Sequence, residues 1–318
     1  MHKYIARRLL YAVPTLLGIT LIIFFVLRIL PGDPLVLLYG EGGSASISEA
    51  DKQVIKAKLG LDKPLYRQYG EWLKDVLTGD FGKTFARGDS VAEIIRHRGI
   101  MTGEIAIIAV IVSWLVGLPV GILGAVRQNS VVDYVARFFT IIFLAVPSFW
   151  VAVLVVIALL TVFSYRSPLG IIYPWDDFVG NMRIVLAPGI VLGLATAAYI
   201  ARLARSSLLE VIRDDYIRTA RAKGLNEGTV VLRHALRNAL LPVLTLSGVL
   251  FSLLLSGSVA VEQGFSVPGL GSALIQAFQE RDFVVVQNLV LLYGFLYVVI
   301  NLLIDLAYGW LDPRIQYT

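Results

Sequence analysis

Long apolar segments recur along this 318-residue chain, and each is about as long as a membrane is thick. A helix needs about 20 apolar residues to cross the hydrocarbon core of a bilayer. We predict transmembrane helices near 9–30, 101–125, 136–163, 184–203, 238–262 and 283–307. Glycine or proline occurs within these segments, and both are better tolerated in membrane helices than in soluble ones. The pattern predicts an all-α membrane protein with six transmembrane helices.

Composition supports a membrane protein. Hydrophobic residues make up 57% of the chain and charged residues only 16%, with a mean hydropathy of +0.75. Soluble domains carry about 25% charged residues, and disordered chains have low hydrophobicity, so both classes are excluded. The absence of cysteine excludes disulfides, thiolate metal sites and thiol nucleophiles.

Basic residues in the short loops predict the orientation. Lys3, Arg7 and Arg8 precede the first span, whose apolar run is too long for a cleaved signal peptide. With this end inside, the inner segments hold 14 basic and seven acidic residues, against 14 basic and 15 acidic residues outside. The excess of positive charge belongs on the cytoplasmic side. We therefore expect a multi-pass membrane protein with both termini in the cytoplasm.

The spans define the expected domain organisation. It comprises a cytoplasmic N-terminus with the first helix (1–30), an extracytoplasmic helical segment (31–100), a transmembrane core (96–308), a cytoplasmic loop (204–237) and a cytoplasmic tail (309–318). Within the extracytoplasmic segment, one helix is expected between Ser48 and Gly60, and an amphipathic helix between Pro64 and Gly79. This segment is either a lid on the outer leaflet or a docking surface for an external partner.

The sequence gives little support for a catalytic or metal-binding site. The three histidines lack metal-ligand spacing, and no acids converge as a catalytic pair would require. The sequence Gly82-Lys83-Thr84 ends like a phosphate-binding loop, but that loop requires a glycine where this chain has Leu77. We expect no catalytic residue, no metal and no cofactor bound by this chain.

Ionisable residues within the spans are expected only at their ends. Glu104 lies at the outer end of the second span and Asp305 at the inner end of the sixth. Proton-coupled carriers place such groups near the midplane, so a proton relay is disfavoured. This argument does not apply to a sodium site built from backbone carbonyls, which stays an alternative.

Small residues recur every four positions in three spans, which places them on one helix face. The stripes are Ser113, Gly117, Gly121 and Ala125; Gly189, Gly193 and Ala197; and Gly248, Ser252, Ser256 and Ala260. Helix packing is the simplest interpretation. The fifth span also carries hydroxyl groups on this face, so Thr245, Ser252 and Ser256 are the candidate solute pathway.

The loop after the fourth span carries the strongest functional signal. Apolar residues at helical spacing are followed by a basic helix that ends at Gly224, where glycine allows the chain to reverse in the left-handed conformation. A short rigid helix of this kind can transmit the movement of a soluble partner protein to the membrane helices. The alternative is a juxtamembrane helix that contacts anionic membrane lipid. Four acids interrupt the eight basic residues, which argues against nucleic acid.

A series of short motifs runs the length of the chain in a fixed order. They are ARRLL at 6–10, LGIT at 17–20, LPGDP at 30–34, LGLDKP at 59–64, GDFG at 79–82, VPSFW at 146–150, FSVPGLG at 265–271 and DPR at 312–314. With the 205–242 loop, this series resembles the permease subunits of ATP-binding-cassette (ABC) importers, in the dipeptide/oligopeptide/nickel branch and its dipeptide-permease B-type subunit. The general signature begins Glu-Ala-Ala, whereas this chain has Arg218-Thr219-Ala220, with Gly224 in register.

The resemblance implies a type I importer permease fold and a set of partners. These are a homologous second permease, two ABC ATPase subunits that bind ATP and magnesium, an extracytoplasmic solute-binding protein and a peptide-like solute. The resemblance also implies a permease core at 96–308 and a location in the bacterial inner (plasma) membrane. The residues implied to couple this chain to the ATPase are Tyr216, Ile217, Arg218, Thr219, Ala220, Arg221, Ala222, Lys223, Gly224 and Leu225, with Gly224 shaping the turn. Ala220 and Ala222 are expected to permit close contact with the motor, and Arg218, Arg221 and Lys223 to supply ionic contacts.

The sequence leaves alternatives for both the solute and the class of transporter. Importers of this branch take dipeptides, longer peptides, glutathione, nickel chelates or oligosaccharides. An ion-coupled secondary carrier is the competing class, and a membrane-embedded enzyme is a third class without a catalytic cluster in its favour.

Overall fold

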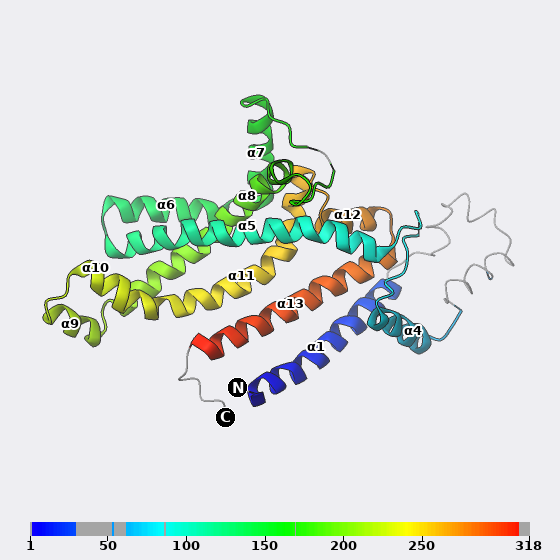
Figure 1. The fold of residues 1–318 in the computed structure, drawn as a ribbon, viewed down its shortest axis with the longest axis horizontal. Coiled ribbons are helices and arrows are strands. Elements are labelled where there is room, and N and C mark those ends of the chain that lie inside the picture. Colours follow the sequence, from blue (N-terminus) through cyan, green and yellow to red (C-terminus); the bar gives the residue numbers. More distant parts are fainter. Residues whose placement is uncertain (1, 30–52, 54–61, 86, 169, 312–318) are drawn as a thin grey trace. The chain divides into compact units, whose positions relative to one another are not determined.

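The computed structural model describes residues 2–29, 53, 62–85, 87–168 and 170–311, and nearly all of them lie in helices (Figure 1). The chain forms two compact units. The first is built from residues 1–99 and 272–318, and the second from residues 100–271. The helix expected between Ser48 and Gly60 lies outside the described residues.

The first unit packs the first and last long helices together. Helix α1 (His2–Ile29) lies against α13 (Phe283–Leu311). At Gly294 of α13 the backbone comes so close to Ile19 that an added Cβ would lie 3.0 Å from its Cγ2. This glycine therefore allows the two helices to approach.

An aromatic cluster attaches α4 (Leu65–Thr78) to α1. The Phe24 ring is buried, with the rings of Tyr69 and Trp72 5.2 and 6.0 Å away. The hydroxyls of Tyr69 and Thr20 are 2.8 Å apart. The amphipathic helix predicted after Pro64 is confirmed, and its Tyr69 and Trp72 pack within the chain, whereas Tyr66 is exposed.

A buried carboxylate begins α13. Asp282 accepts hydrogen bonds from the backbone N–H of Val285 at 3.2 Å and of Phe85 at 2.6 Å, and burial raises the pKa of its carboxyl group. Asn288, six residues later, donates to the carbonyl of Phe81 at 2.8 Å. Both side chains hold residues 81–85 against the start of α13.

In the second unit, glycines bring α5 (Val91–Val126) and α8 (Phe178–Val211) into backbone contact. An added Cβ at Gly117 would lie 2.7 Å from the carbonyl oxygen of Ala197, and one at Gly193 would lie 2.6 Å from Cβ of Val112. Two of the small-residue stripes predicted from the sequence therefore form a helix-packing interface. The helix-packing interpretation is confirmed for them.

The third predicted span is wrong as a single helix. It consists of α6 (Val131–Ala145) and α7 (Ser148–Thr161), which are bent by 99° at Val146 and Pro147 (Figure 1). Proline has no N–H to donate and forces the preceding residue out of the helical region, and Val146 is extended at φ −88° and ψ 123°. The apolar length alone did not reveal this break.

The remaining helices follow the predicted order. After α8 come α9 (Asp215–Ala222), α10 (Glu227–Thr229), the π-helix η1 (Val230–Ala235), α11 (Leu236–Phe265) and α12 (Leu270–Gln279). Five helices among the described residues are long and apolar enough to cross a membrane, or six spans when α6 and α7 count as one. The prediction of an all-α membrane protein is confirmed.

Gly121 and Gly103 of α5 provide a test of this packing. An added Cβ at Gly121 would lie 2.6 Å from the carbonyl oxygen of Ala201, whereas nothing lies within 4 Å at Gly103. Gly121→Ala should destabilise the protein by about 1–3 kcal/mol through overpacking. Gly103→Ala should be neutral or stabilising, because alanine favours the helix. Thermal unfolding in detergent measures both, and equal melting temperatures for the two variants would contradict the packing.

Candidate functional site: the loop between α8 and α11

A short helix follows α8 and ends in a tight turn, as the sequence predicts. Helix α9 spans Asp215–Ala222 and lies with α10 beyond the ends of α8 and α11 (Figure 1). The turn is made at Gly224, whose φ is +81° and whose N–H donates to the carbonyl of Arg221 at 2.9 Å. A Cβ at Gly224 would meet nothing within 4 Å. Backbone conformation, not space, therefore favours glycine here.

The inner face of α9 is anchored in an apolar cluster. Ile217 is fully buried and Ala220 is 8% exposed, and both pack in one cluster with Leu208 of α8 and with Val230 and Ala235 of η1. This cluster joins α9 to the helix before it and to the helix after it. A displacement of α9 must therefore move these neighbours or break the cluster.

The structure corrects the expected role of Ala220. We expected its small side chain to let a partner approach, but it faces the interior of the chain. The helical period places 217 and 220 on one face, and the neighbouring helices, which the sequence does not reveal, cover that face. Ala222 is exposed, as expected.

Tyr216 connects α9 to the start of α11. Its hydroxyl accepts a hydrogen bond from Nδ2 of Asn238 at 2.8 Å, while the side chain stays 40% exposed. One edge of the ring is therefore held by the chain, and the other is free to contact a partner.

Two ion pairs lie on the exposed face of α9. Arg218 contacts Asp215 at 3.1 Å, and Nε of Arg221 donates to Glu227 at 3.0 Å, a hydrogen bond that raises the pKa of Arg221. The second pair spans the Gly224 turn and ties its two sides together. Exposed pairs of this kind contribute little to stability. The other predicted contact residues on this side are exposed: Thr219, Lys223 and Leu225.

A buried ion pair that the sequence analysis missed lies beside this loop. Asp133, fully buried in the first turn of α6, accepts from Nε and Nη2 of Arg205 at 2.7 and 2.9 Å. It also accepts from Arg137 at 3.1 Å and from the backbone N–H of Asn129 at 3.0 Å. This carboxylate fixes α6 to α8 shortly before α8 reaches α9. The sequence signal was an acid three residues after the helix-capping Ser130.

Another ionisable residue lies at a span end, besides Glu104 and Asp305, and the sequence analysis missed it. Glu262, at the end of the fifth predicted span, is fully buried and accepts from the hydroxyls of Thr102 at 2.8 Å and Ser258 at 3.0 Å. Glu104 accepts from Nδ2 of Asn181 at 2.8 Å.

The candidate pathway residues lie in different surroundings. The hydroxyl of Thr245 donates to the carbonyl of Leu241 at 3.0 Å on an exposed face, while Ser252 is buried and donates to Gly248 at 3.3 Å. The side chain of Ser256 lies outside the described residues. Their membership of one solute-facing stripe stays a prediction.

Comparison with known proteins identifies the family. The family model for the binding-protein-dependent transport system inner membrane component matches residues 117–317, and the model for the N-terminal part of such membrane components matches residues 1–102. The chain belongs to this family. It is therefore a multi-pass membrane permease, as the resemblance implied.

Relatives match this permease over its whole length. The oligopeptide transport system permease protein AppB of Bacillus subtilis is 38% identical over 320 residues, with 100% of both chains covered. The dipeptide transport system permease protein DppB of Escherichia coli K12 is 39% identical over 340 residues, with 100% of this chain and 99% of the relative covered.

Solved structures show the same fold. A structure of the MetNI methionine ABC transporter in an inward-facing conformation matches with a TM-score of 0.55 and 20% identity, over 69% of this chain and 96% of that one. An amino acid ABC transporter matches with a TM-score of 0.54 and 17% identity, over 68% and 93%. The type I importer permease fold is confirmed.

The buried and exposed arginine pairs should differ in their effect on stability. Arg205→Ala leaves the buried Asp133 carboxylate with weaker compensation, which costs about 2 kcal/mol because Arg137 and the Asn129 N–H remain. Arg218→Ala removes an exposed pair and should cost less than about 1 kcal/mol. Thermal unfolding of the two variants in the same detergent makes the comparison. A larger loss from Arg218→Ala would contradict the structure.

At position 224, the effect of a substitution should depend only on whether the new residue can adopt the left-handed backbone conformation. Gly224→Asn should keep the turn, because asparagine enters the left-handed region readily, whereas Gly224→Val should disrupt it. Hydrogen exchange at the amides of α9 measures the effect. We expect near-normal protection for Gly224→Asn and faster exchange for Gly224→Val, and equal exchange would contradict a conformational requirement.

Proposed function

We propose that this permease forms half of the solute pathway of an ATP-driven, binding-protein-dependent importer of dipeptides or oligopeptides. The observation that carries the proposal is α9, a short helix whose inner face is buried against two membrane helices and whose outer face is charged and exposed. The relatives named as oligopeptide and dipeptide permeases support the solute class, because they align from end to end. Glutathione, nickel chelates and oligosaccharides are the alternatives within the family.

The proposed partners follow from the family resemblance. They are a homologous second permease, two ABC ATPases that bind ATP and magnesium, and an external solute-binding protein. This permease is then a non-catalytic subunit with both termini in the cytoplasm, which is also the side of α9. Thr245, Ser252 and Ser256 are proposed to border the solute pathway.

Mechanical coupling starts at the exposed face of α9. Tyr216, Arg218, Arg221 and Lys223 present one aromatic and three cationic side chains to the groove of an ATPase. When the ATPases close on ATP, they displace α9. The apolar cluster around Ile217 passes this displacement to α8 and η1.

Two further features extend the displacement into the membrane. The Asp133–Arg205 pair links α8 to α6, so the start of α6 moves with the end of α8. The π-helix η1 lies between α9 and α11, and π-helical turns are frequent at functional sites. We propose that η1 absorbs the rearrangement as α11 tilts.

The buried carboxylate of Glu262 does not restore the ion-coupled carrier as the better hypothesis. Its hydrogen bonds come from Thr102 and Ser258 of the same unit, and Thr102 in turn accepts from the N–H of Leu270 at 2.8 Å. These contacts tie the turn after α11 to α5, which is a structural role. A carrier would transport solute alone in liposomes under an ion gradient, without the ATPases.

Substituting Gly224 tests the coupling role. Gly224→Asp should abolish dipeptide uptake and solute-stimulated ATPase activity in proteoliposomes that contain the whole importer and its binding protein. Aspartate keeps the turn but adds a negative charge to the basic contact face. Membrane insertion and subunit assembly should be unchanged.

The matched control is Gly224→Asn, which has the same shape without the charge. We expect Gly224→Asn to retain most of its transport. Normal uptake by Gly224→Asp would refute the coupling role. Equal loss in both variants would mean that size at this position, not charge, blocks the contact.

A further inference from the structure

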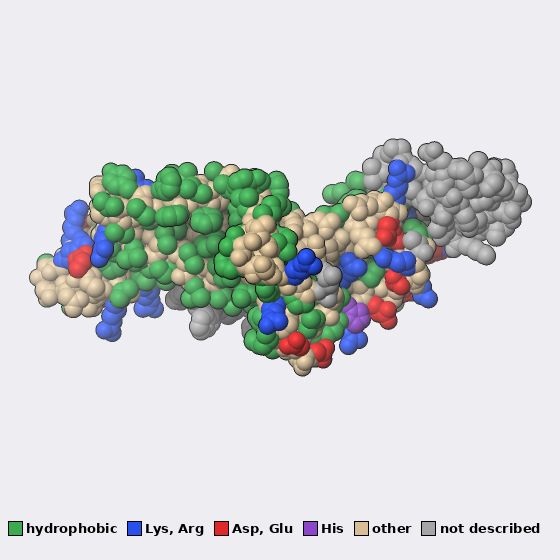
Figure 2. Space-filling model, turned by 90° about the horizontal axis from the view of Figure 1, so that it is seen from above, with side chains coloured by type: hydrophobic (Ala, Val, Ile, Leu, Met, Phe, Trp, Pro, Cys, Tyr) green, Lys and Arg blue, Asp and Glu red, His purple; other side chains and the backbone are tan. Residues whose placement is uncertain are grey.

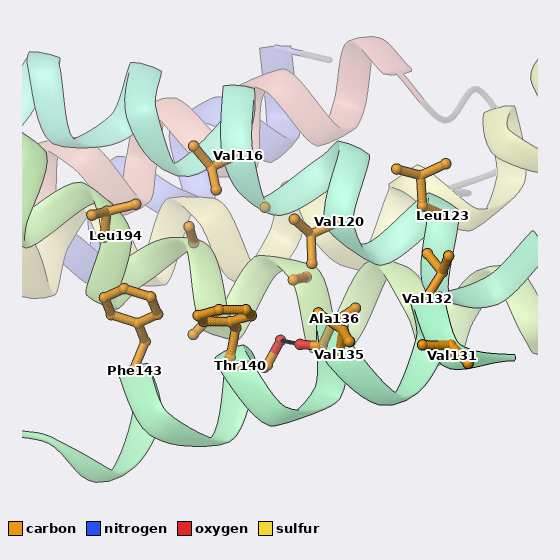
Figure 3. A pocket seen from close by; sticks show the side chains of 15 residues that line it. Val116, Val120, Leu123, Val131, Val132, Val135, Ala136, Thr140, Phe143 and Leu194 are labelled. Atoms are coloured by element: carbon orange, nitrogen blue, oxygen red, sulfur yellow. Dashed lines mark hydrogen bonds between the residues drawn. The ribbon is translucent and has the colours of Figure 1, made fainter. Parts of the chain in front are cut away.

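An apolar groove of about 440 Å³ opens on the second unit between α5, α6 and α8 (Figure 3). Val116, Val120 and Leu123 of α5 form one wall, and side chains of α6 from Val131 to Phe143 form the other. The floor is α8, which contributes Leu194, Ala197, Ala198 and Ala201.

The groove presents almost no hydrogen-bonding group. The hydroxyl of Thr140 is the one polar side-chain group among its lining residues, and it donates to the carbonyl of Ala136 at 2.7 Å. An ordered water needs two to four polar partners, so the groove is suited to hydrocarbon. Its occupant must be apolar where it lies between the helices.

Small residues in the floor and exposed residues in the walls produce this shape. Ala197, Ala198 and Ala201 are buried but too short to fill the space between α5 and α6. Val131 and Phe139 of α6 are 77% and 54% exposed. The groove is thus open along the side of helices that are apolar and long enough to span a membrane.

Three arginines lie close in sequence to lining residues of the groove. Arg127 lies in the turn between α5 and α6, one helical turn after the wall residue Leu123, and Arg202 lies one turn after the floor residue Ala198. Both side chains are exposed, and no hydrogen bond or ion pair is seen for either among the described residues. Arg137 of α6 bonds to Asp133, but its buried Nε–H has no partner. Figure 2 shows apolar side chains along the face of this unit and Lys and Arg at one end, where Figure 1 places the α5–α6 turn together with α9 and α10.

We propose that this groove binds one anionic glycerophospholipid, with an acyl chain between α5, α6 and α8 and the phosphate group at Arg127. Burial of the acyl chain's methylene groups against the apolar walls would hold the chain. Basic residues between transmembrane helices form sites for anionic headgroups. The site is separate from the solute pathway and goes beyond the proposed transport function.

The size of the groove favours a lipid chain over a protein helix. A helix is about 10 Å across, and two turns are about 11 Å long. A single extended acyl chain is narrower and fits between side chains that remain in place.

Lipid titration of the purified full-length chain tests the proposal. Native mass spectrometry in detergent, with added dioleoylphosphatidylglycerol or dioleoylphosphatidylcholine, measures the affinity for each lipid. One retained phosphatidylglycerol is expected, bound at least about fivefold more tightly than phosphatidylcholine, because each basic group near a phosphate contributes about 1 kcal/mol. Equal affinity for the two lipids would overturn the headgroup assignment.

Matched variants locate the site. Ala198→Phe fills the groove and should abolish binding of the retained lipid, whereas Leu115→Phe on the exposed face of α5 should not change it. Arg127→Gln should lower the affinity for phosphatidylglycerol about fivefold and leave phosphatidylcholine unchanged. Arg213→Gln, an exposed arginine after α8, is the charge control. If Ala198→Phe does not fold, Val135→Trp narrows the groove from its exposed rim, and undiminished lipid binding by the folded variant overturns the proposal.

Photo-crosslinking distinguishes a lipid from a protein occupant. A benzophenone amino acid at Val135, illuminated in membranes of the native host, should add the mass of one phospholipid to the chain. A crosslink to another polypeptide, or to the chain itself, overturns the proposal and identifies the groove as a protein interface.

Discussion

The close approach of α5 and α8 is the constraint on which the second unit depends. Apolar side chains gain little by contacting each other in lipid, which is itself apolar, so packing and backbone proximity must hold membrane helices together. Gly117, Gly121, Gly189 and Gly193 remove the side chains that would separate the two helices. Helix α8 can then run as a single rod from Phe178 to Val211, to the start of the loop. The position of α9 depends on this rod.

At the end of α8, apolar contact and electrostatics act together. Ile217 is buried against α8 and η1, while Asp133 and Arg205 fix α6 to α8. The buried ion pair is directional, because two hydrogen bonds from one guanidinium define the angle between the groups. The apolar cluster is not directional, but it requires close contact on all sides. Together they hold the helix ends at this loop in a fixed arrangement.

The sequence predicted the parts of the fold that depend on length and periodicity. Apolar runs of about 20 residues located the spans, and a basic run ending at Gly224 located the short helix and its turn. It could not predict features that depend on which surfaces meet. The length of the third span concealed the bend at Pro147, and the inward orientation of Ala220 depends on helices distant in sequence. The burial of Asp133 and Glu262 was not predicted, because both lie near helix ends, where a sequence does not reveal burial.

The Glu262 carboxylate imposes a condition on the turn that follows α11. An added Cβ at Gly269 would lie 2.3 Å from its Oε2, and one at Gly271 would lie 2.5 Å from the Cα of Val259. No side chain can therefore be introduced at 269 unless the acid at 262 becomes shorter or moves away. The constraint runs in one direction: position 262 can change while 269 remains glycine, whereas a side chain at 269 can follow only after 262 has changed.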